Sequence, residues 1–516
     1  MNRFSSNWIV VEVGFCIAAW ALFRSKWFKS FFSKLWLPYP PGPAAKNWIA
    51  GNISEIPVEN QWFLFTEWSK IYGDLTYFRA LHQHFIVINK LEVAIELFEK
   101  RSNNYSSRPH ATMVDLMGWD FNSGLKPYGN IWRNQRRLLQ QYLKPEATRS
   151  YQTTQVQKIH DMLLQLLESP NDFMNHVQHS SGSIIMATMY GHDVQTKDDP
   201  YTKIAGLALD RLAIALFPGA YLVNTISALR LLPKWLPGCA EFNNFAVETR
   251  TLTDKMRNDP VEKVQQLRGT SGERRCIAGN MLENCRSDDE LEDIKCVCAT
   301  MYAGGADTTI SSVQTFFYAM ANYYDVQSKA QEEIDRVVGR ERLPSFEDRP
   351  SMPYSEAIVR EILRWRPLTP LGVAHTSSDE DIYEGYYIPK GTALMPNIWC
   401  MTRDPAKYDD PETFNPSRFF NPDGTLNDDD LNYGFGFGRR ICPGRHFAKA
   451  TVWLSVVSVL ATFDIRKKKD ATGKDIPVDQ AYTQGLFSRP MPFECAITPR
   501  SEATTALLRD AIAHRD

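Results

Sequence analysis

The chain has 516 residues, of which 43% are hydrophobic and 12% aromatic, so it can bury a large core. Its 58 Lys plus Arg residues balance 60 Asp plus Glu residues, and this balance argues against a nucleic-acid partner. The nine cysteines are an odd and scattered set, which is typical of a reducing compartment and not of a disulfide framework. Size alone favours two or more domains, but no linker, repeat or low-complexity tract separates them.

The N-terminal stretch differs in character from the rest of the chain. Residues 8–23 are apolar except for Glu12, and residues 24–36 are basic and aromatic. The apolar run is slightly short for a membrane-spanning helix, and Glu12 weakens the pattern. The positive charge that follows predicts a cytosolic location for the remainder, although Ala19-Trp20-Ala21 leaves a cleaved signal peptide as an alternative. We predict a membrane anchor over residues 1–37.

A proline-rich segment follows the anchor. Residues 38–43 read Pro-Tyr-Pro-Pro-Gly-Pro, a composition that cannot be helical and predicts a stiff, extended spacer. An ordinary surface loop is the alternative. Directly after a membrane anchor, the favoured interpretation is a hinge that holds the body of the protein against the bilayer.

Two aromatic and basic positions stand out in the next helical pattern. Trp132 and Arg136 are four residues apart and therefore share one helix face. From these residues alone, a solvated basic helix is the favoured interpretation.

A long helix is predicted from about Asp288 to Met320. Ser287 can cap its first turn while Glu290 reaches back, which is the spacing of a capping box. Residues 303–309 read Ala-Gly-Gly-Ala-Asp-Thr-Thr, and each glycine in a helix interior costs roughly 1 kcal/mol relative to alanine. Either the glycines serve close packing and Thr308 bonds back to a carbonyl, or the local composition serves a function.

Glu361 and Arg364 are spaced i to i+3 on a further predicted helix, so their charges can pair. Near the C-terminus, residues 435–444 read Phe-Gly-Phe-Gly-Arg-Arg-Ile-Cys-Pro-Gly. The glycines permit a tight turn and the approach of a flat ligand, and we expect Arg439 and Arg440 to favour the thiolate of Cys442. Such a thiolate can bind iron. A buried free cysteine in a glycine-rich loop is the alternative.

The Cys442 motif and the motifs before it occur in the order that is typical of the cytochrome P-450 family of haem-thiolate monooxygenases. From about residue 38 to its end, the chain resembles this family. The resemblance implies a mainly α fold with small β-sheets, formed as a single large haem domain over residues 38–516 behind the anchor. It implies that Cys442 is the axial ligand of the iron of haem b. It also implies haem propionate contacts from Trp132, Arg136, His375 and Arg440.

The same resemblance assigns roles to the polar residues of the long helix and of a structural lock. Asp307 and Thr308 match the acid and alcohol that relay protons to dioxygen, and the small residues before them leave room above the iron. Glu361, Arg364 and Arg418 match a trio that steadies the haem-binding core. Asp307 and Thr308 are therefore the expected catalytic residues, whereas the trio is structural.

The implied reaction is insertion of one oxygen atom from O2 into a hydrophobic small molecule. No flavin or nicotinamide site is found, so the electrons must come from an NADPH-cytochrome reductase, for which a basic surface is predicted from Arg133, Arg137, Arg439, Arg445 and Lys449. The expected location is the endoplasmic reticulum membrane, with a single anchor and a cytosolic catalytic domain. Ordinary solvated charge is the alternative interpretation of the basic residues.

The sequence predicts an apolar and partly aromatic pocket that is lined from distant segments by Leu116, Met117, Trp119, Phe121, Ala303, Ala306, Leu371, Val373 and Phe487. The residues around the motifs resemble those of monooxygenases that modify secondary metabolites in mushroom-forming fungi. Terpenoids, polyketides and indole amines are the candidate substrates. A haem protein that carries electrons or senses a gas, or a haem-thiolate isomerase or dehydratase, remains an alternative, and Asp307 with Thr308 argues against both.

Overall fold

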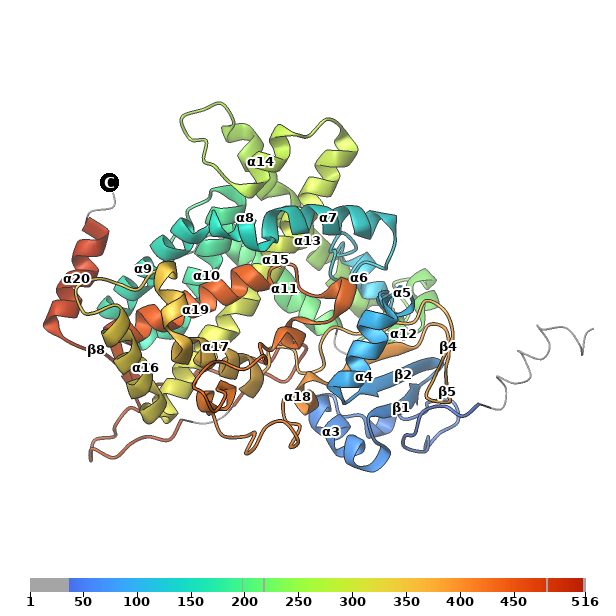
Figure 1. The fold of residues 1–516 in the computed structure, drawn as a ribbon. Helices are drawn as coiled ribbons and strands as arrows, with labels where there is room; N and C mark the ends of the chain where they lie inside the picture. The colour runs from blue at the N-terminus through green and yellow to red at the C-terminus, as the bar shows by residue number, and fades with distance from the viewer. Residues whose placement is uncertain (1–36, 197, 217–218, 479–480, 514–516) are drawn as a thin grey trace, which may run out of the picture.

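The computed structural model describes residues 37–196, 198–216, 219–478 and 481–513. Helices dominate it, as the sequence predicts, and small sheets lie at the periphery (Figure 1). The longer helices are α3 Gln61–Tyr72, α7 Asn130–Leu143, α9 Gln152–Glu168, α10 Phe173–Tyr190, α11 Pro200–Leu216, α13 Cys239–Leu267, α15 Asp288–Asn322, α16 Tyr324–Val337, α17 Pro353–Trp365, α19 Arg445–Thr462 and α20 Glu502–Ala513.

Shorter helices join these elements. They are α4 Leu91–Ile95, α5 Ser102–Tyr105, α6 Thr112–Leu116, α8 Pro145–Arg149, α12 Leu222–Thr225, α14 Ile277–Glu283 and α18 Ile398–Met401. Short 3-10 helices are η1 Ile53–Glu55, η3 Pro170–Asp172, η4 Ser227–Leu231, η5 Phe346–Ser351, η6 Pro416–Phe419, η7 Asn432–Phe435 and η8 Gly438–Arg440, and η2 Glu96–Lys100 is a π-helix.

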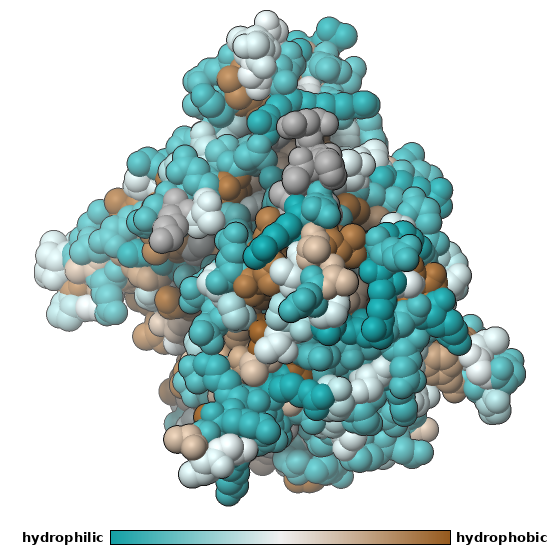
Figure 2. All heavy atoms as spheres, turned by 90° about the vertical axis from the view of Figure 1, so that its left-hand side faces the viewer, coloured by the Kyte–Doolittle hydropathy of each residue, from teal (hydrophilic) through white to brown (hydrophobic). Residues whose placement is uncertain are grey.

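The strands form three sheets. They are β1 Leu75–Ala80, β2 Gln83–Ile88, β3 His375–Thr376, β4 Asp381–Tyr383, β5 Tyr386–Ile388, β6 Ala393–Pro396, β7 Phe463–Arg466 and β8 Ala496–Pro499. The largest sheet has the order β1-β2-β6-β3, in which β2 and β6 are parallel and the other pairs antiparallel. The strands β4 and β5 form one hairpin, and β7 pairs with β8. The face of the molecule that carries α20 and α16 is mostly hydrophilic, with hydrophobic side chains in scattered groups (Figure 2).

Two hydrophobic cores meet near residue 442. The larger core is built around α10, α15 and α19 and includes Phe447. The second core lies under the β1-β2-β6-β3 sheet and includes Phe98 and Phe437. Because Phe437 and Phe447 flank Cys442 in the sequence, the chain passes from one core to the other at this cysteine.

The proline-rich segment is not helical, as predicted, and it is attached to the sheets. The carbonyl of Pro38 accepts a hydrogen bond from the Tyr387 N–H (2.8 Å), and that of Pro41 accepts one from the Tyr77 N–H (2.8 Å). The ring of Tyr39 stacks on that of Tyr77 with centroids 4.8 Å apart. The direction of the chain at residue 38 is thus set by the sheets, and the segment is not a free spacer.

The predicted membrane anchor falls on residues 1–36, which lie outside the described residues, and on residue 37. Within the described ranges, no helix has both the length and the apolar character needed to cross a bilayer.

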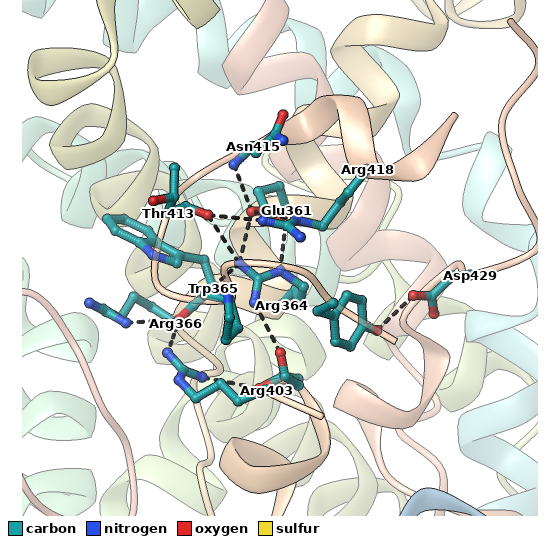
Figure 3. Close-up of polar contacts among 12 residues, drawn as sticks. Glu361, Arg364, Trp365, Arg366, Arg403, Thr413, Asn415, Arg418 and Asp429 are labelled. Carbon is teal, nitrogen blue, oxygen red and sulfur yellow. Dashed lines mark hydrogen bonds and ion pairs between the residues drawn. The ribbon is translucent and has the colours of Figure 1, made fainter. Parts of the chain in front are cut away.

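The structure brings together the predicted trio at the end of α17 (Figure 3). The Arg364 guanidinium donates to both carboxylate oxygens of Glu361 at 2.6 and 2.8 Å, and Arg418 Nε lies 3.3 Å from Glu361 Oε1. The side chains of Glu361 and Arg364 are fully buried. Arg364 also donates to the Thr402 and Pro411 carbonyls, so the trio ties α17 to the segment 402–418.

We expect Glu361→Gln to lower the free energy of unfolding by about 3–5 kcal/mol, because two buried guanidinium groups lose their counter-charge. Urea unfolding followed by circular dichroism measures the loss. The matched control is Glu356→Gln on the same helix, which breaks a partly exposed pair with Arg349 and should cost about 1 kcal/mol or less. Equal losses in the two variants would contradict a special role for the buried trio.

Candidate functional site

The Cys442 loop, residues 435–444, is closed by a short hydrogen bond. The Cys442 N–H donates to the Phe435 carbonyl at 2.8 Å. Gly436 and Gly438 have positive φ angles of 89° and 49°, and a Cβ on Gly438 would lie 2.3 Å from the carbonyl oxygen of Phe98. Only glycine meets both demands at position 438, so the predicted tight turn is present and has a backbone neighbour as its cause.

The charges that act on Cys442 differ from those predicted. Burial raises the pKa of the Cys442 thiol, and this effect is opposed by the Gly444 N–H, by Arg136 and Arg445, and by the Arg445 N–H at the start of α19. Arg439 and Arg440, which were expected to favour the thiolate, are not among these largest influences. Arg439 is exposed and bonds to Tyr128 and Asn103, and Arg440 points to backbone carbonyls.

Buried arginines gather beside this loop. Arg440, Arg136 and Arg108 are between 7% and 9% exposed. The sequence reasoning missed Arg108, because no spacing rule connects it with the later motifs. Its signal is structural: Arg108 lies within residues 106–126, to which Arg440 also donates, and it ties this segment to the residues before β3.

Each of these arginines donates to main-chain oxygens. Arg108 donates to the carbonyls of Gly124, Val373 and Ala374 at 2.6–2.9 Å. The guanidinium of Arg440 donates to the carbonyls of Ser106, Ser123 and Lys126 at 2.7–3.1 Å.

No carboxylate in the described part of the chain forms an ion pair with Arg108, Arg136 or Arg440. Burial lowers the pKa of Arg108 to about 9, that of Arg136 to about 10 and that of Arg440 to about 8. The proximity of Arg108 and Arg136 adds to the effect at Arg440. Buried charges are normally paired. This cluster therefore fits an anionic group that the polypeptide does not itself supply.

Trp132 and Arg136 share the buried face of α7, as predicted. The guanidinium of Arg440 lies 4.3 Å from the Trp132 ring centroid, and Arg136 donates to the Ile441 carbonyl at 2.5 Å. Arg136 Nε is buried and has no hydrogen-bond partner among the described residues. The interpretation as a solvated basic helix is thus wrong for these two residues, although Arg133 and Arg137 on the same helix are exposed.

His375 lies on β3 and is 3% exposed. Its Nδ1 lies 2.7 Å from the carbonyl oxygen of Tyr105. Since a carbonyl only accepts, Nδ1 carries the proton and Nε2 is left for another partner. Burial, with Arg108 and then Arg440 adding to it, lowers the pKa of His375 well below its ordinary value. The structure therefore places this histidine next to the arginine cluster.

The long helix α15 begins at the predicted cap. Ser287 Oγ accepts from the Glu290 N–H at 3.2 Å, and the Glu290 carboxylate accepts from the Arg286 N–H at 2.6 Å. The two glycines of α15 have different surroundings. A Cβ on Gly305 would lie 2.7 Å from Ile185 of α10, whereas one on Gly304 would meet nothing within 4 Å. Close packing explains Gly305, and Gly304 faces open space.

Thr308 lies one turn beyond Gly304 and is partly exposed. Its hydroxyl donates to the Gly304 carbonyl at 2.7 Å, so its oxygen can still accept a hydrogen bond. The predicted alternative of a back-bonded threonine is therefore observed, on the open side of the helix. The side chain of Asp307 lies outside the described residues.

Ser123 connects α15 with the arginines. Its N–H donates to Thr300 Oγ1 at 3.2 Å, and its carbonyl accepts from Arg440 at 3.1 Å. The glycine face of α15 begins one turn after Thr300, which brings it to the side of the loop that Arg108 and Arg440 hold. Sequence positions that are far apart thus meet around one region between α7, α15 and α19.

The predicted apolar lining divides into two groups. Met117, Trp119, Phe121 and Ala303 are buried and belong to the larger core. The other predicted residues keep partial exposure and are Leu116, Ala306, Leu371, Val373 and Phe487. Only the side chains of the second group have exposed surface that a ligand could contact.

Comparisons with known proteins agree with this geometry. The family model described as Cytochrome P450 matches residues 40–494. Cytochrome P450 monooxygenase 98 of Postia placenta is 37% identical, with 98% of each chain covered. Cytochrome P450 monooxygenase COX2 of Coprinopsis cinerea is 39% identical over 92% of this chain and 91% of its own. Cytochrome P450 monooxygenase ple1 of Rhodocybe pseudopiperita is 36% identical over 91% of both. A chain that carries this cysteine loop, the buried arginines and the trio on α17 belongs to the cytochrome P450 family and is an oxidoreductase of that family.

Proposed function

We propose that this P450 enzyme inserts one atom of dioxygen into a hydrophobic small molecule, with Cys442 as the thiolate ligand of haem b. The observation that carries the proposal is the position of Cys442 at the start of α19, beside a cluster of buried arginines that have no carboxylate partner among the described residues. A group with one metal and two carboxylates satisfies both features at once.

Haem b, when bound, supplies the iron at which dioxygen is activated. Arg136, Arg440 and Arg108 would hold its propionates, because a guanidinium suits a carboxylate. The Trp132 ring lies against the Arg440 guanidinium, and Arg136 Nε has no other partner in the described residues. Because His375 Nδ1 already donates to the Tyr105 carbonyl, Nε2 is the nitrogen that would bind a carboxylate. It could do so only when it is protonated. A propionate at that position would oppose the effect of burial on the pKa of His375.

Asp307 and Thr308 are the proposed proton-handling pair. The Thr308 hydroxyl lies on the open side of α15 and keeps an acceptor site while it donates to Gly304. It can therefore hold a proton-bearing partner next to the glycine face. Asp307, the preceding residue, supplies the acid in this proposal.

The proposed substrate is an apolar fungal secondary metabolite of the terpenoid, polyketide or indole amine class. The support is the partial exposure of the second lining group, which is entirely apolar. The fungal origin of the similar P450 monooxygenases agrees with a fungal pathway.

An NADPH-cytochrome reductase is the proposed electron donor. Arg133, Arg137 and Arg439 are exposed and can meet an acidic partner. Lys449 is less suited to this role, because its Nζ donates to the Asp430 carbonyl and to Asn432 Oδ1. The proposed basic surface therefore consists of the three exposed arginines, with Arg445 at its edge.

We propose that residues 1–37 anchor the enzyme in the endoplasmic reticulum membrane, with residues 38–516 as the cytosolic catalytic domain. The attachment of Pro38 and Pro41 to the sheets supports a defined exit of the chain toward such an anchor. The apolar and then basic character of residues 8–36 supports the orientation.

The first prediction concerns Cys442→Ala. The reduced, carbon-monoxide-bound enzyme should show the red-shifted Soret band of a thiolate-ligated haem, and the variant should lose it, because no other cysteine lies in such a loop. Cys285→Ala, which removes a partly exposed cysteine elsewhere, is the control and should keep the band. Retention of the band by Cys442→Ala would refute the ligand assignment.

The second prediction concerns Thr308→Ala. The variant should keep the haem spectrum and accept electrons, but NADPH consumption should yield less product and more hydrogen peroxide, since the hydroxyl that holds the proton path is gone. Thr309→Ala, which removes the neighbouring buried hydroxyl, is the matched control. The ratio of product to NADPH measures the effect, and an unchanged ratio would make Thr308 a structural residue.

The third prediction concerns removal of residues 1–37. The truncated enzyme should leave the membrane fraction in high salt and mild detergent while it keeps the thiolate-haem spectrum, because every haem motif lies after residue 37. Fractionation of both forms with spectroscopy of each fraction is the measurement. A freely soluble full-length chain, or loss of the spectrum on truncation, would contradict the separation of anchor and catalytic domain.

A further inference from the structure

A chain of polar groups connects the segment 402–418 with the segment that enters the Cys442 loop. Tyr408 is 3% exposed and Tyr433 is 9% exposed. The Tyr408 hydroxyl lies 2.6 Å from Asp429 Oδ2, a contact drawn in Figure 3, and 2.8 Å from the Tyr433 hydroxyl. Lys407 Nζ lies 2.9 Å from the other oxygen of Asp429.

The direction of these hydrogen bonds follows from the chemistry of the groups. An ionised carboxylate can only accept, so Tyr408 gives its one hydrogen to Asp429. The hydroxyl of Tyr433 must then donate to that of Tyr408. The chain of donors therefore runs from Tyr433 through Tyr408 to Asp429, and Tyr408 is the only member bonded on both sides. Burial raises the pKa of both tyrosines, so each keeps its hydrogen at neutral pH.

The middle of the chain contacts the buried trio through Tyr408, and its Tyr433 end adjoins the Cys442 loop. The Arg364 guanidinium lies 5.3 Å from the centroid of the Tyr408 ring. The Tyr433 carbonyl accepts the Gly436 N–H at 3.0 Å, and the Phe435 carbonyl, two residues after Tyr433, accepts the Cys442 N–H at 2.8 Å. A shift of Tyr433 would thus move the acceptor that closes the cysteine loop.

The segment between Asp429 and Tyr433 needs to be held. Leu431 has a φ of 55°, a left-handed conformation that is costly for a leucine, and its side chain is only 1% exposed. From the other side, Lys449 of α19 donates to the Asp430 carbonyl and to Asn432 Oδ1 at 2.9 and 3.0 Å. Hydrogen bonds hold this strained backbone segment on both sides. We expect the segment to relax when the hydrogen bonds on one side are lost.

We propose that Tyr408 is a positioning residue for the thiolate: through Tyr433 it holds the strained entry to the Cys442 loop, and so keeps the cysteine in place for iron. The inference rests on the proposed role of Cys442 as the haem ligand. It assigns to Tyr408 no contact with haem or substrate.

The test uses the full-length holoenzyme and Tyr408→Phe. In the reduced, carbon-monoxide-bound state, the thiolate-type Soret band should decay about fivefold faster than in the wild type, because a buried hydrogen-bond chain is broken in the middle. Hydrogen exchange at the Gly436 and Cys442 amides should also accelerate, since their acceptors move with Tyr433.

The asymmetry of the chain gives a sharper comparison. Tyr433→Phe removes only the first donor and leaves the bond from Tyr408 to Asp429, so its effect should be smaller than that of Tyr408→Phe. The double variant should decay no faster than Tyr408→Phe alone, because Tyr433 has already lost its acceptor there. A larger effect of Tyr433→Phe than of Tyr408→Phe would overturn the proposed direction of the chain.

A matched control separates positioning from general stability. Tyr482 also donates to a hydroxyl, that of Thr315 at 3.3 Å, and it makes no contact with the cysteine loop. Tyr482→Phe should lower the thermal unfolding midpoint by less than Tyr408→Phe, because only one longer hydrogen bond is lost, and it should not accelerate the decay of the band. Equal decay rates in the two variants, or a decay of Tyr408→Phe within about twofold of the wild type, would overturn the proposal.

The failure of this inference can be told from failure of the proposed function. A wild-type enzyme without the thiolate-type band would refute the role of Cys442, whereas a normal wild-type band with an unaffected Tyr408→Phe would refute only the role of Tyr408. Should Tyr408→Phe not accumulate as a haem protein, Tyr433→Phe decides the question, because a decay rate equal to that of the wild type would then overturn the proposal.

Discussion

The hydrogen bond from the Cys442 N–H to the Phe435 carbonyl closes the loop around which the rest of the site is arranged. The loop can close because Gly436 and Gly438 take positive φ angles and because the backbone of Phe98 leaves no room for a side chain at position 438. It ends at α19, whose first N–H groups face the thiol. Two hydrophobic cores meet here, and each one holds one side of the loop.

A buried excess of positive charge next to the loop is the second constraint. Arg108, Arg136 and Arg440 are buried at a cost in solvation that main-chain carbonyls offset only in part. The carbonyls that accept from Arg108 and Arg440 belong to the loops between α5 and α7 and before β3, and the acceptor of Arg136 belongs to the Cys442 loop. The arginines therefore serve the fold and the site together: they hold the loops, and their remaining charge makes the region suitable for carboxylates.

The trio, with Glu361 and Arg364 on α17 and Arg418 on η6, and the hydroxyl chain of Tyr408 connect the outer segments with this centre. Glu361 is the counter-charge of Arg364 and Arg418; the side chains of Glu361 and Arg364 are fully buried, and that of Arg418 is 9% exposed. Arg403 and Glu412 form a second pair just outside the trio (2.7 Å), and the Trp365 N–H donates to the Glu412 carbonyl (Figure 3). These contacts join side chains from segments that are far apart in sequence.

The sequence by itself determined much of the site, because local rules suffice for it. The cap at Ser287, the face shared by Trp132 and Arg136, and the glycine turn around Cys442 follow from spacings within one turn or one loop. Other features were decided only by the tertiary structure. Arg108 joins the cluster, Arg439 turns away from Cys442, and Gly305 packs against Ile185, because these outcomes depend on which distant backbone or side chain fills the neighbouring space. Spacing in one chain segment carries no information about that neighbour, which is why Trp119 could be predicted as apolar lining and yet be buried in the core.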